Sequence, residues 1–276
     1  MRVSDDMKFV LLCAALTLMA LSAAVLGADP AADEIQQRIH AGLNAFDAAV
    51  SAMREDPARA REHWQDALSD FLAVRNAGVR SAALEFNIGN TYARLGDIGR
   101  AVLHYRRAER INPRGRSLQI NLDQARQQVT PRLAWPNGSA GLFGMMAWAE
   151  RTTLWERVFI AGGLSLAGWA ALAIGLRLRR SGATAAGLVC VVISLIVAGS
   201  AALDLRAAAL EPPAVLVTGD QVLRGGRGDG YEPVIKERLG AGVEVYVIDT
   251  RGDWCEVRLS NDICGWLPGS ALERVE

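Results

Sequence analysis

The chain has 276 residues, a formal net charge of zero and 51% hydrophobic residues. Nucleic-acid-binding domains carry a basic surface, so this balanced charge gives no reason to expect a nucleic-acid partner. The hydrophobic share exceeds that of an ordinary soluble domain. Because the excess falls in three runs that are each long enough to matter for a membrane, we expect a multidomain membrane protein.

The first apolar run, 9–26, has the pattern of a secretion signal. It follows Lys8 and ends in small residues, so we predict a signal peptide over 1–28. Translation can begin at Met1 or at Met7, and a start at Met7 removes the two acidic residues that otherwise precede the apolar run. The alternative is an uncleaved N-terminal anchor, which would export the next domain just the same.

A helix-turn-helix unit is predicted from Asn87 to Pro113, because small and aromatic residues fall where one helix must nest against the next. The residues with this spacing are Gly89, Tyr92, Ala101, Tyr105, Ala108 and Pro113. Their pattern is the signature of the tetratricopeptide repeat. The sequence departs from the signature at Glu85, where a large apolar residue is usual.

Neighbouring units appear at a shift of about 34 residues, the length of this repeat. Ala67, Phe71 and Val74 anticipate Ala101, Tyr105 and Ala108, and Asn87 recurs as Asn121. We therefore predict an all-α domain of two to three repeats over 29–130, with a capping helix that ends near Val129. A first helix within 35–53 is out of phase with the period, which favours an insertion at the turn around Asp56.

Two further apolar runs within 158–203 hold roughly 20 residues each, enough to cross a bilayer as helices. We predict a transmembrane hairpin there, flanked by linkers over 131–157 and 204–213. Its loop, 177–182, has three arginines and no acid. Positive loops stay in the cytoplasm, so both flanks should lie outside. The alternative is a buried helical hairpin in a soluble domain.

After the prolines at 212–213, hydrophobic residues no longer recur at helical spacing but alternate along the chain, so the region 214–276 is predicted to be all-β. It resembles the bacterial SH3-like barrel, in which a segment like 222–224 opens the module and one like 265–268 closes it. The residues expected on the surface or in the core of this barrel are Tyr231, Trp254 and Trp266. The glycine-rich stretch 225–230 lacks the features of a phosphate-binding loop.

The order of these parts is distinctive: an export signal, tetratricopeptide repeats, two membrane helices around a basic loop, and an SH3-like barrel. Together with the phrase from Phe86 to Tyr92, it resembles the BatE family of bacterial aerotolerance operons. The resemblance implies a cell-envelope component that works near von Willebrand-type membrane proteins and a MoxR-type ATPase. It implies no defined biochemical activity.

The sequence offers little catalytic chemistry. His40, His63 and His104 are scattered over predicted helices without metal-ligand spacing or a paired nucleophile. We predict no enzyme, no metal site and no cofactor. Cys255 and Cys264 would face an oxidising compartment, and they form either a disulfide or two unpaired thiols, one of them packed in the barrel. Counting from the turn at 261–262 places Leu259, rather than Cys255, opposite Cys264.

A partner-binding groove is predicted on the first helices of the repeats. Asn87 and Asn121 would project from equivalent positions, with Asn90 and Arg94 one and two turns along the same helix as Asn87. These side chains suit the backbone and the carboxylates of a bound peptide. In the alternative, Asn87 bonds only to the neighbouring repeat.

Two functions are consistent with the sequence. The first is a scaffold in the bacterial inner membrane, with both soluble domains in the periplasm and the Arg177–Arg180 loop in the cytoplasm, which binds partner proteins through the groove. The second is a wall-sensing protein that binds peptidoglycan through the SH3-like domain, where exposed Tyr231 and Trp254 would contact the ligand.

Overall fold

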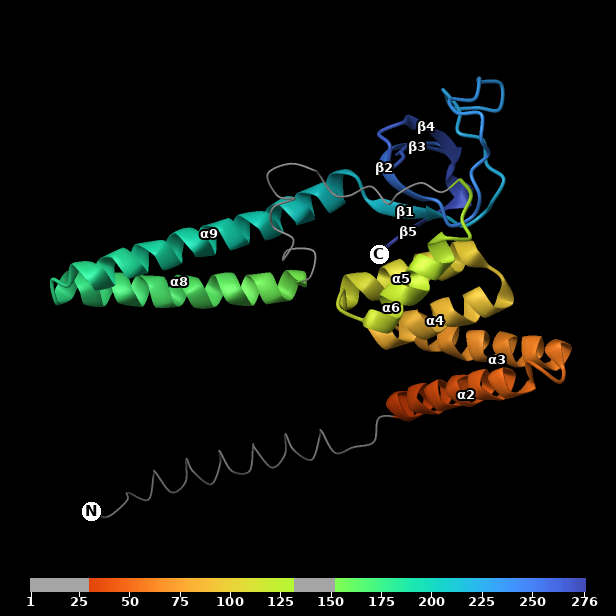
Figure 1. Cartoon of the computed structure of the whole chain (residues 1–276), viewed down its shortest axis with the longest axis horizontal. Helices are drawn as coiled ribbons and strands as arrows, with labels where there is room; N and C mark the ends of the chain where they lie inside the picture. Colours follow the sequence, from red (N-terminus) through yellow and green to blue (C-terminus); the bar gives the residue numbers. More distant parts are fainter. Residues whose placement is uncertain (1–29, 132–151) are drawn as a thin grey trace, which may run out of the picture.

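The computed structural model describes residues 30–131 and 152–276, and it has three parts (Figure 1). The predicted signal peptide and most of the predicted linker 131–157 lie outside the described residues. The helices are α2 (Pro30–Ala52), α3 (Pro57–Asn76), α4 (Ala82–Leu95), α5 (Ile98–Ile111), α6 (Arg116–Arg126), α8 (Leu154–Arg177) and α9 (Ser181–Leu210). The strands are β1 (Pro213–Leu216), β2 (Glu244–Arg251), β3 (Trp254–Arg258), β4 (Cys264–Pro268) and β5 (Leu272–Arg274).

The helix-turn-helix unit predicted from Asn87 is the pair α4 and α5. Ser81 caps α4 by accepting a hydrogen bond from the Leu84 amide at 3.2 Å, and Asp97 caps α5 in the same way at the Arg100 amide, at 3.0 Å. Gly96 ends α4 with a φ of 85°, a left-handed conformation that glycine adopts without strain. The local turn chemistry alone therefore accounts for this pair.

A glycine under an aromatic ring holds each helix pair together. A Cβ atom on Gly89 would lie 2.6 Å from the Tyr105 ring, and one on Gly42 would lie 2.7 Å from the Phe71 ring. The pair α2 and α3 thus repeats the contact made by α4 and α5, and Figure 1 shows the pairs stacked with α2 farthest from the sheet.

The predicted insertion around Asp56 is small in the turn itself, which spans 53–56, whereas the turn between α4 and α5 spans 96–97. The turn between α2 and α3 is short, and Asp56 caps α3 by accepting a hydrogen bond from the Arg59 amide. Most of the extra residues between Gly42 and Phe71 lie in the helices, and they lengthen α2 by about one turn and α3 by about two turns relative to α4 and α5. Longer helices explain why the first helix is out of phase with the period.

A charged cluster fills the position where the repeat signature has a large apolar residue. Glu85 is only 2% exposed, and it accepts hydrogen bonds from Arg75 Nε at 2.8 Å and from His104 Nδ1 at 2.6 Å. Tyr92 stacks on the His104 ring with centroids 5.4 Å apart. The Arg75–Glu85–His104 cluster therefore joins α3, α4 and α5 by buried polar contacts.

The C-terminal part is an antiparallel sheet with strand order β4-β3-β2-β1-β5. Its inward side chains alternate, as in β3, where Cys255 and Val257 are buried. The predicted opening strand at 222–224 is absent; isolated bridges pair Arg224 with Trp266 and with Pro233 instead. Strand β2 runs to Arg251, and the chain reverses at Gly252, whose φ is 60°.

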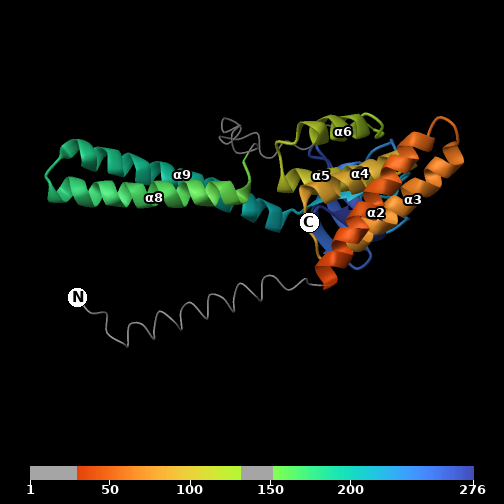
Figure 2. The same cartoon turned by 90° about the horizontal axis from the view of Figure 1, so that it is seen from below.

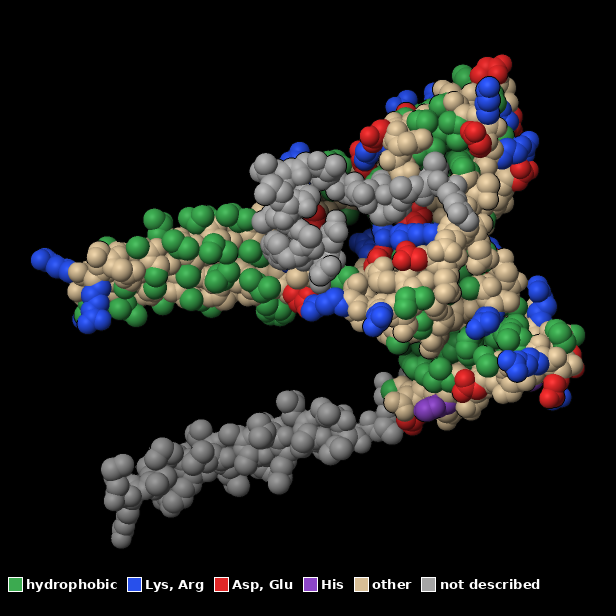
Figure 3. Space-filling model, viewed as in Figure 1, with side chains coloured by type: hydrophobic (Ala, Val, Ile, Leu, Met, Phe, Trp, Pro, Cys, Tyr) green, Lys and Arg blue, Asp and Glu red, His purple; other side chains and the backbone are tan. Residues whose placement is uncertain are grey.

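The long hairpin of α8 and α9 is held together by close backbone approach. A Cβ atom on Gly168 would lie 3.0 Å from the Gly187 carbonyl oxygen, so only small residues fit at this crossing. Helix α9 continues to Leu210, so most of the predicted linker 204–213 is helical. Both helices are long and apolar enough to cross a membrane. Their hydrophobic side chains cover the hairpin surface, and Lys and Arg side chains gather at its closed end (Figure 3).

The sheet packs directly on the last helices of the repeat region. One buried apolar cluster runs from α5 and α6 into the sheet without interruption. A Cβ atom on Gly99 would lie 3.0 Å from the Leu216 carbonyl oxygen, and one on Gly242 would lie 2.6 Å from Val129. We call this contact the seam. Figure 2 shows the sheet behind α4 and α5.

Ion pairs and hydrogen bonds close the edges of the seam. Arg126 donates to both carboxylate oxygens of Glu244, at 2.7 and 3.2 Å. Arg107 donates to Glu273 at 3.2 Å, and the Gly240 amide donates to the Thr130 carbonyl at 2.6 Å. The segments before and after the hairpin therefore form one head, which the sequence did not predict.

Candidate functional site

Asn121 on α6 hydrogen-bonds Asn90 on α4, and Arg94 on α4 contacts Met53 just after α2. We call the exposed side of α2, α4 and α6 around these contacts the first-helix face. On α4 it carries Asn87, Asn90 and Arg94, spaced three and four residues apart and therefore aligned on one side of the helix. Ile88 and Gly89 occupy the opposite, buried side. The sequence thus places the predicted groove residues of α4 on one face.

The side-chain oxygen of Asn90 is already engaged. Its Oδ1 atom accepts hydrogen bonds from the Tyr105 hydroxyl at 2.9 Å and from the Asn121 amide at 2.8 Å. Burial raises the pKa of Tyr105 to about 12, so this hydroxyl remains a donor. Asn121 was expected to point to a ligand, but it ties α6 to α4 instead. Asn121 and Asn87 therefore have different roles in the structure, although they hold equivalent positions in the repeat.

Asn87 and Arg94 are the groups on α4 that remain available. The half-buried Asn87 side chain makes no hydrogen bond within the described residues, and its carbonyl accepts one from Thr91 at 2.8 Å. Arg94 is exposed, and its guanidinium contacts only the Met53 sulfur, at 3.9 Å. Across residues 30–131 and 152–276 no carboxylate pairs with Arg94. The face therefore offers an amide and an unpaired cation.

The α2 side of the first-helix face carries exposed apolar side chains beside the polar residues His40 and Asp47. Leu43, Val50 and Met53 are 39%, 43% and 39% exposed. Leu43 stands one residue after Gly42, the same place that Asn90 holds relative to Gly89. The sequence did not predict these residues, because a period of about 34 residues does not match the longer helices α2 and α3. The pairing of Gly42 with Phe71, which repeats that of Gly89 with Tyr105, is the signal that could have located them.

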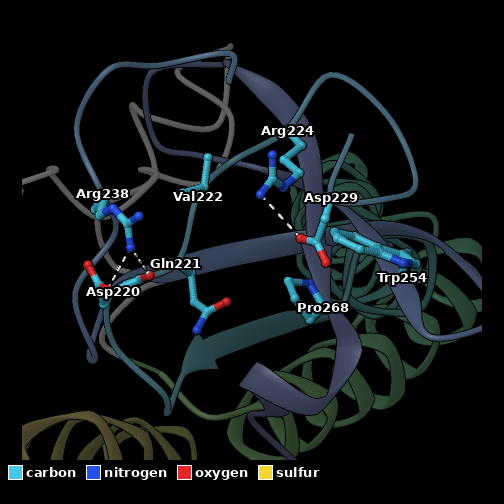
Figure 4. Close-up of a pocket in the computed structure, with 8 residues that line it drawn as sticks. All are labelled: Asp220, Gln221, Val222, Arg224, Asp229, Arg238, Trp254 and Pro268. Carbon is cyan, nitrogen blue, oxygen red and sulfur yellow. Dashed lines mark hydrogen bonds and ion pairs between the residues drawn. The ribbon is translucent and has the colours of Figure 1, made fainter. Parts of the chain in front are cut away.

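A second candidate site is a polar pocket of about 180 Å³ on the sheet (Figure 4). Two ion pairs stand on its rim, Arg224 with Asp229 at 3.2 Å and Arg238 with Asp220 at 2.6 Å. The remaining lining residues are Gln221, Val222, Trp254 and Pro268. Sequence reasoning singled out only Trp254 among these residues, because ion pairs between distant loop positions leave no local pattern.

The glycine-rich stretch 225–230 folds back over the sheet beside this pocket. Arg224 donates to the Tyr231 carbonyl at 2.9 Å, and the Tyr231 ring covers Gly226. Arg227 lies 5.7 Å above the Trp266 ring, a cation–π contact. Tyr231 is exposed but does not line the pocket, so the predicted pairing of Tyr231 with Trp254 as one aromatic surface is not formed there.

The strand register keeps the two cysteines of the sheet apart. Cys255 pairs with Leu267, and Cys264 pairs with Arg258, one residue from the predicted partner Leu259. Both thiols are free, Cys255 buried and Cys264 exposed. The disulfide between them that the sequence left open is therefore not formed. Within the described ranges, no group of three His, Cys, Asp or Glu residues is arranged to hold a metal ion.

Comparisons of the chain with protein-family models, with curated proteins and with solved structures find no match. The function is therefore argued from the first-helix face, the seam and the pocket alone.

Proposed function

We propose that this chain is a membrane-anchored scaffold that binds a partner protein through its first-helix face. In this proposal the helices α2 to α6 are tetratricopeptide repeats, the sheet is an SH3-like module, and the chain is a BatE-like envelope component. By that resemblance, the partners are von Willebrand-type membrane proteins and a MoxR-type ATPase.

The first-helix face is the observation that carries the proposal. It combines exposed apolar side chains, two from α2 and that of Met53 just after it, with the unpaired Arg94 guanidinium and the free Asn87 amide. Exposed apolar surface beside a cation suits a peptide segment that carries apolar residues and a carboxylate. A partner with that chemistry would contact the exposed apolar side chains, the Asn87 amide and the Arg94 guanidinium together.

The seam supports the anchoring part of the proposal. Because α5 and α6 precede the hairpin and the sheet follows it, their direct contact requires both to lie on the same side of a membrane that α8 and α9 would cross. The basic loop at the closed end then favours the cytoplasm. Both soluble parts would accordingly lie in the periplasm of a bacterial inner membrane.

A topology experiment tests the anchoring. A phosphatase reporter that is active only in the periplasm is fused after Glu276 or at Ser181. We expect activity after Glu276 and none at Ser181. Activity at Ser181 would contradict the arrangement.

A binding experiment tests the scaffold. Tagged full-length chain is recovered from detergent-solubilised membranes, and the proteins bound to it are quantified by mass spectrometry. Arg94→Ala with Asn87→Ala should reduce capture by at least about ten-fold, because it removes a charge-assisted hydrogen bond and a neutral one. Arg59→Ala, on the exposed surface of α3, is the matched control and should retain full capture.

The Asn121→Ala variant separates binding from stability. It loses the hydrogen bond to Asn90, so the head should be less stable by about 0.5 to 1.5 kcal/mol. Capture measured well below the melting temperature should remain near that of the unmodified chain. Undiminished capture by the Arg94 and Asn87 double variant would remove the first-helix face from the mechanism.

Binding of peptidoglycan through the sheet is the second candidate function. It is favoured by the polar pocket beside Trp254, which a wall peptide could enter. Sedimentation of the detergent-solubilised chain with purified sacculi tests it. Sedimentation that is lost on Trp254→Ala supports this function, and a chain that stays in the supernatant excludes it.

A further inference from the structure

The pocket on the sheet has a balanced set of charges. Its rim holds two guanidinium groups and two carboxylates, from Arg224, Arg238, Asp220 and Asp229. A purely anionic ligand would meet two carboxylates there, and a purely cationic one would meet two guanidinium groups. Charge complementarity therefore favours a ligand that carries one group of each sign.

Arg224 is held in place more firmly than its partner. Its backbone forms two hydrogen bonds with that of Trp266: the Arg224 amide donates to the Trp266 carbonyl at 3.1 Å, and the Arg224 carbonyl accepts from the Trp266 amide at 2.8 Å. Its guanidinium also donates to the Tyr231 carbonyl. The Asp229 side chain is 90% exposed and belongs to the glycine-rich stretch. An ion pair with so exposed a member contributes little, so a ligand carboxylate can replace Asp229 on a preorganised guanidinium.

The opposite rim repeats the arrangement. Arg238 donates to Asp220 at 2.6 Å, and both side chains are exposed. Figure 4 shows the two ion pairs on different sides of the space, with Gln221, Trp254 and Pro268 around it. A carboxylate is thus available on each side to receive an ammonium group from a ligand that lies between them.

The size of the pocket limits the ligand. Pockets for drug-sized molecules have volumes of roughly 300 to 1,000 Å³, whereas this one measures about 180 Å³. It can hold one group of a few heavy atoms, and Val222, Trp254 and Pro268 supply apolar surface for a short carbon chain.

We propose that this pocket binds an α-amino-acid group, with its ammonium and carboxylate on one carbon. The ligand carboxylate pairs with Arg224 in place of Asp229, and the ammonium is received by the released Asp229. The group belongs either to a free amino acid or to the end of a side-chain-linked residue in a peptide. This site is independent of the first-helix face and of partner capture.

Isothermal titration of the full chain in detergent tests the proposal with four small probes. L-alanine carries both charges, propionate only the carboxylate, and ethylamine only the ammonium; γ-L-glutamylglycine carries the same α-amino-acid group on a peptide. We expect L-alanine to bind at least about ten-fold more tightly than propionate or ethylamine, because each of these lacks one charged contact. Tighter binding of γ-L-glutamylglycine assigns the site to a peptide, and tighter binding of L-alanine assigns it to a free amino acid.

Three variants test the roles of individual pocket residues. Asp229→Asn should lower the preference for L-alanine over propionate by several-fold, because it removes both the internal competitor and one ammonium acceptor. Arg224→Gln should abolish binding of both probes. Arg251→Gln is the matched control, since Arg251 makes an exposed ion pair with Asp249 on the same sheet but does not line the pocket.

Two results would overturn the proposal. One is the absence of any heat of binding for both L-alanine and γ-L-glutamylglycine. The other is an Asp229→Asn variant that folds normally and keeps the original preference for L-alanine over propionate.

Discussion

The two helix pairs of the repeat region use the same close contact but differ in what surrounds it. Gly42 lies under Phe71 as Gly89 lies under Tyr105. Four residues before each glycine, however, α2 has an exposed Arg38, whereas α4 has the buried Glu85. The contact between a glycine and an aromatic ring thus fixes the geometry of a pair, and the residue four positions earlier decides how the pair is joined to its neighbour.

The pair α4 and α5 is covered on two sides. The Arg75–Glu85–His104 cluster ties it to α3, and the seam places the sheet on α5. The pair α2 and α3 shares this cluster only through Arg75 on α3, the seam does not reach it, and α2 keeps apolar side chains exposed to solvent. We infer that the second pair is the stable centre of the head and that the first pair is attached to it.

Glu85→Ala should show the largest difference in stability between the two helix pairs. The substitution removes the shared partner of Arg75 and His104 in a buried site, which should lower the free energy of unfolding by about 3 to 5 kcal/mol. Arg38→Ala, at the equivalent position of α2, should change it by no more than about 0.5 kcal/mol, because Arg38 is 46% exposed. Urea unfolding of the full chain in detergent, followed by helical circular dichroism, measures both. Equal effects at the two positions would refute the distinction.

Adding a methyl group to each glycine sharpens the comparison. Gly89→Ala should cost about 1 to 3 kcal/mol, because the new Cβ meets a Tyr105 ring that is fixed by its hydrogen bond to Asn90. Gly42→Ala should cost less, because no hydrogen bond holds the Phe71 ring and it can turn away. The same unfolding measurement decides the order; a larger loss at Gly42 would show that the ring at Tyr105 is not held as described.

Acidification should also act on the second pair. Burial lowers the pKa of His104 below its ordinary value of 6.5, although Glu85 opposes the shift. Burial acts to raise the pKa of Glu85, but the hydrogen bonds and charges of His104 and Arg75 outweigh it and lower the pKa below 4.5. Nearby Arg107 further disfavours a protonated His104.

In both cases the unfolded chain binds protons at a higher pH than the folded one. Stability is therefore present above pH 6.5, falls below it as His104 protonates, and falls again below pH 4.5 as Glu85 protonates. His104 alone can contribute a slope of at most about 1.4 kcal/mol per pH unit. His104→Gln should remove the first decline, and His40→Gln, at an exposed site on α2, should leave it. Unfolding curves collected between pH 4 and pH 8 compare them; an unchanged decline in His104→Gln would assign it to another group.

Residue spacing and capping residues in the sequence correctly predicted the helix pair α4 and α5. The caps at Ser81 and Asp97, the turn at Gly96 and the nesting of Gly89 all lie within one helix pair, so the spacing alone locates them. The first pair was also located, with a helix within 35–53 and Phe71 at the place of Tyr105. A fixed period could not show that most of its extra residues lie within the helices.

The seam could not be predicted because its two sides are far apart in the sequence. Gly99 is small because Leu216 lies against it, and Gly242 because Val129 does. One signal was present: Val102 and Leu103 add apolar surface to α5 beyond the face that carries Ala101 and Tyr105, and all four residues are buried. A helix with apolar residues on two faces needs a second covering element.

Two of the four predicted binding residues are available for a partner, and the other two hold neighbouring helices together. Asn87 and Arg94 are available on the first-helix face, as their spacing on α4 indicated. Asn90 and Asn121 instead hydrogen-bond to each other, and Asn90 also accepts a hydrogen bond from Tyr105. The repeat period cannot reveal such bonds between neighbouring helices. The pocket on the sheet depends on ion pairs between loops and gave no sequence signal.

Hydrogen exchange of the full chain in detergent, read by mass spectrometry, tests the central claim that the second helix pair and the sheet form one body. Backbone amides of α5 and of β1 and β2 should open with the same free energy, the highest in the head, while those of α2 exchange earlier. An α2 as protected as α5, or a sheet that opens independently of α5, would contradict the account.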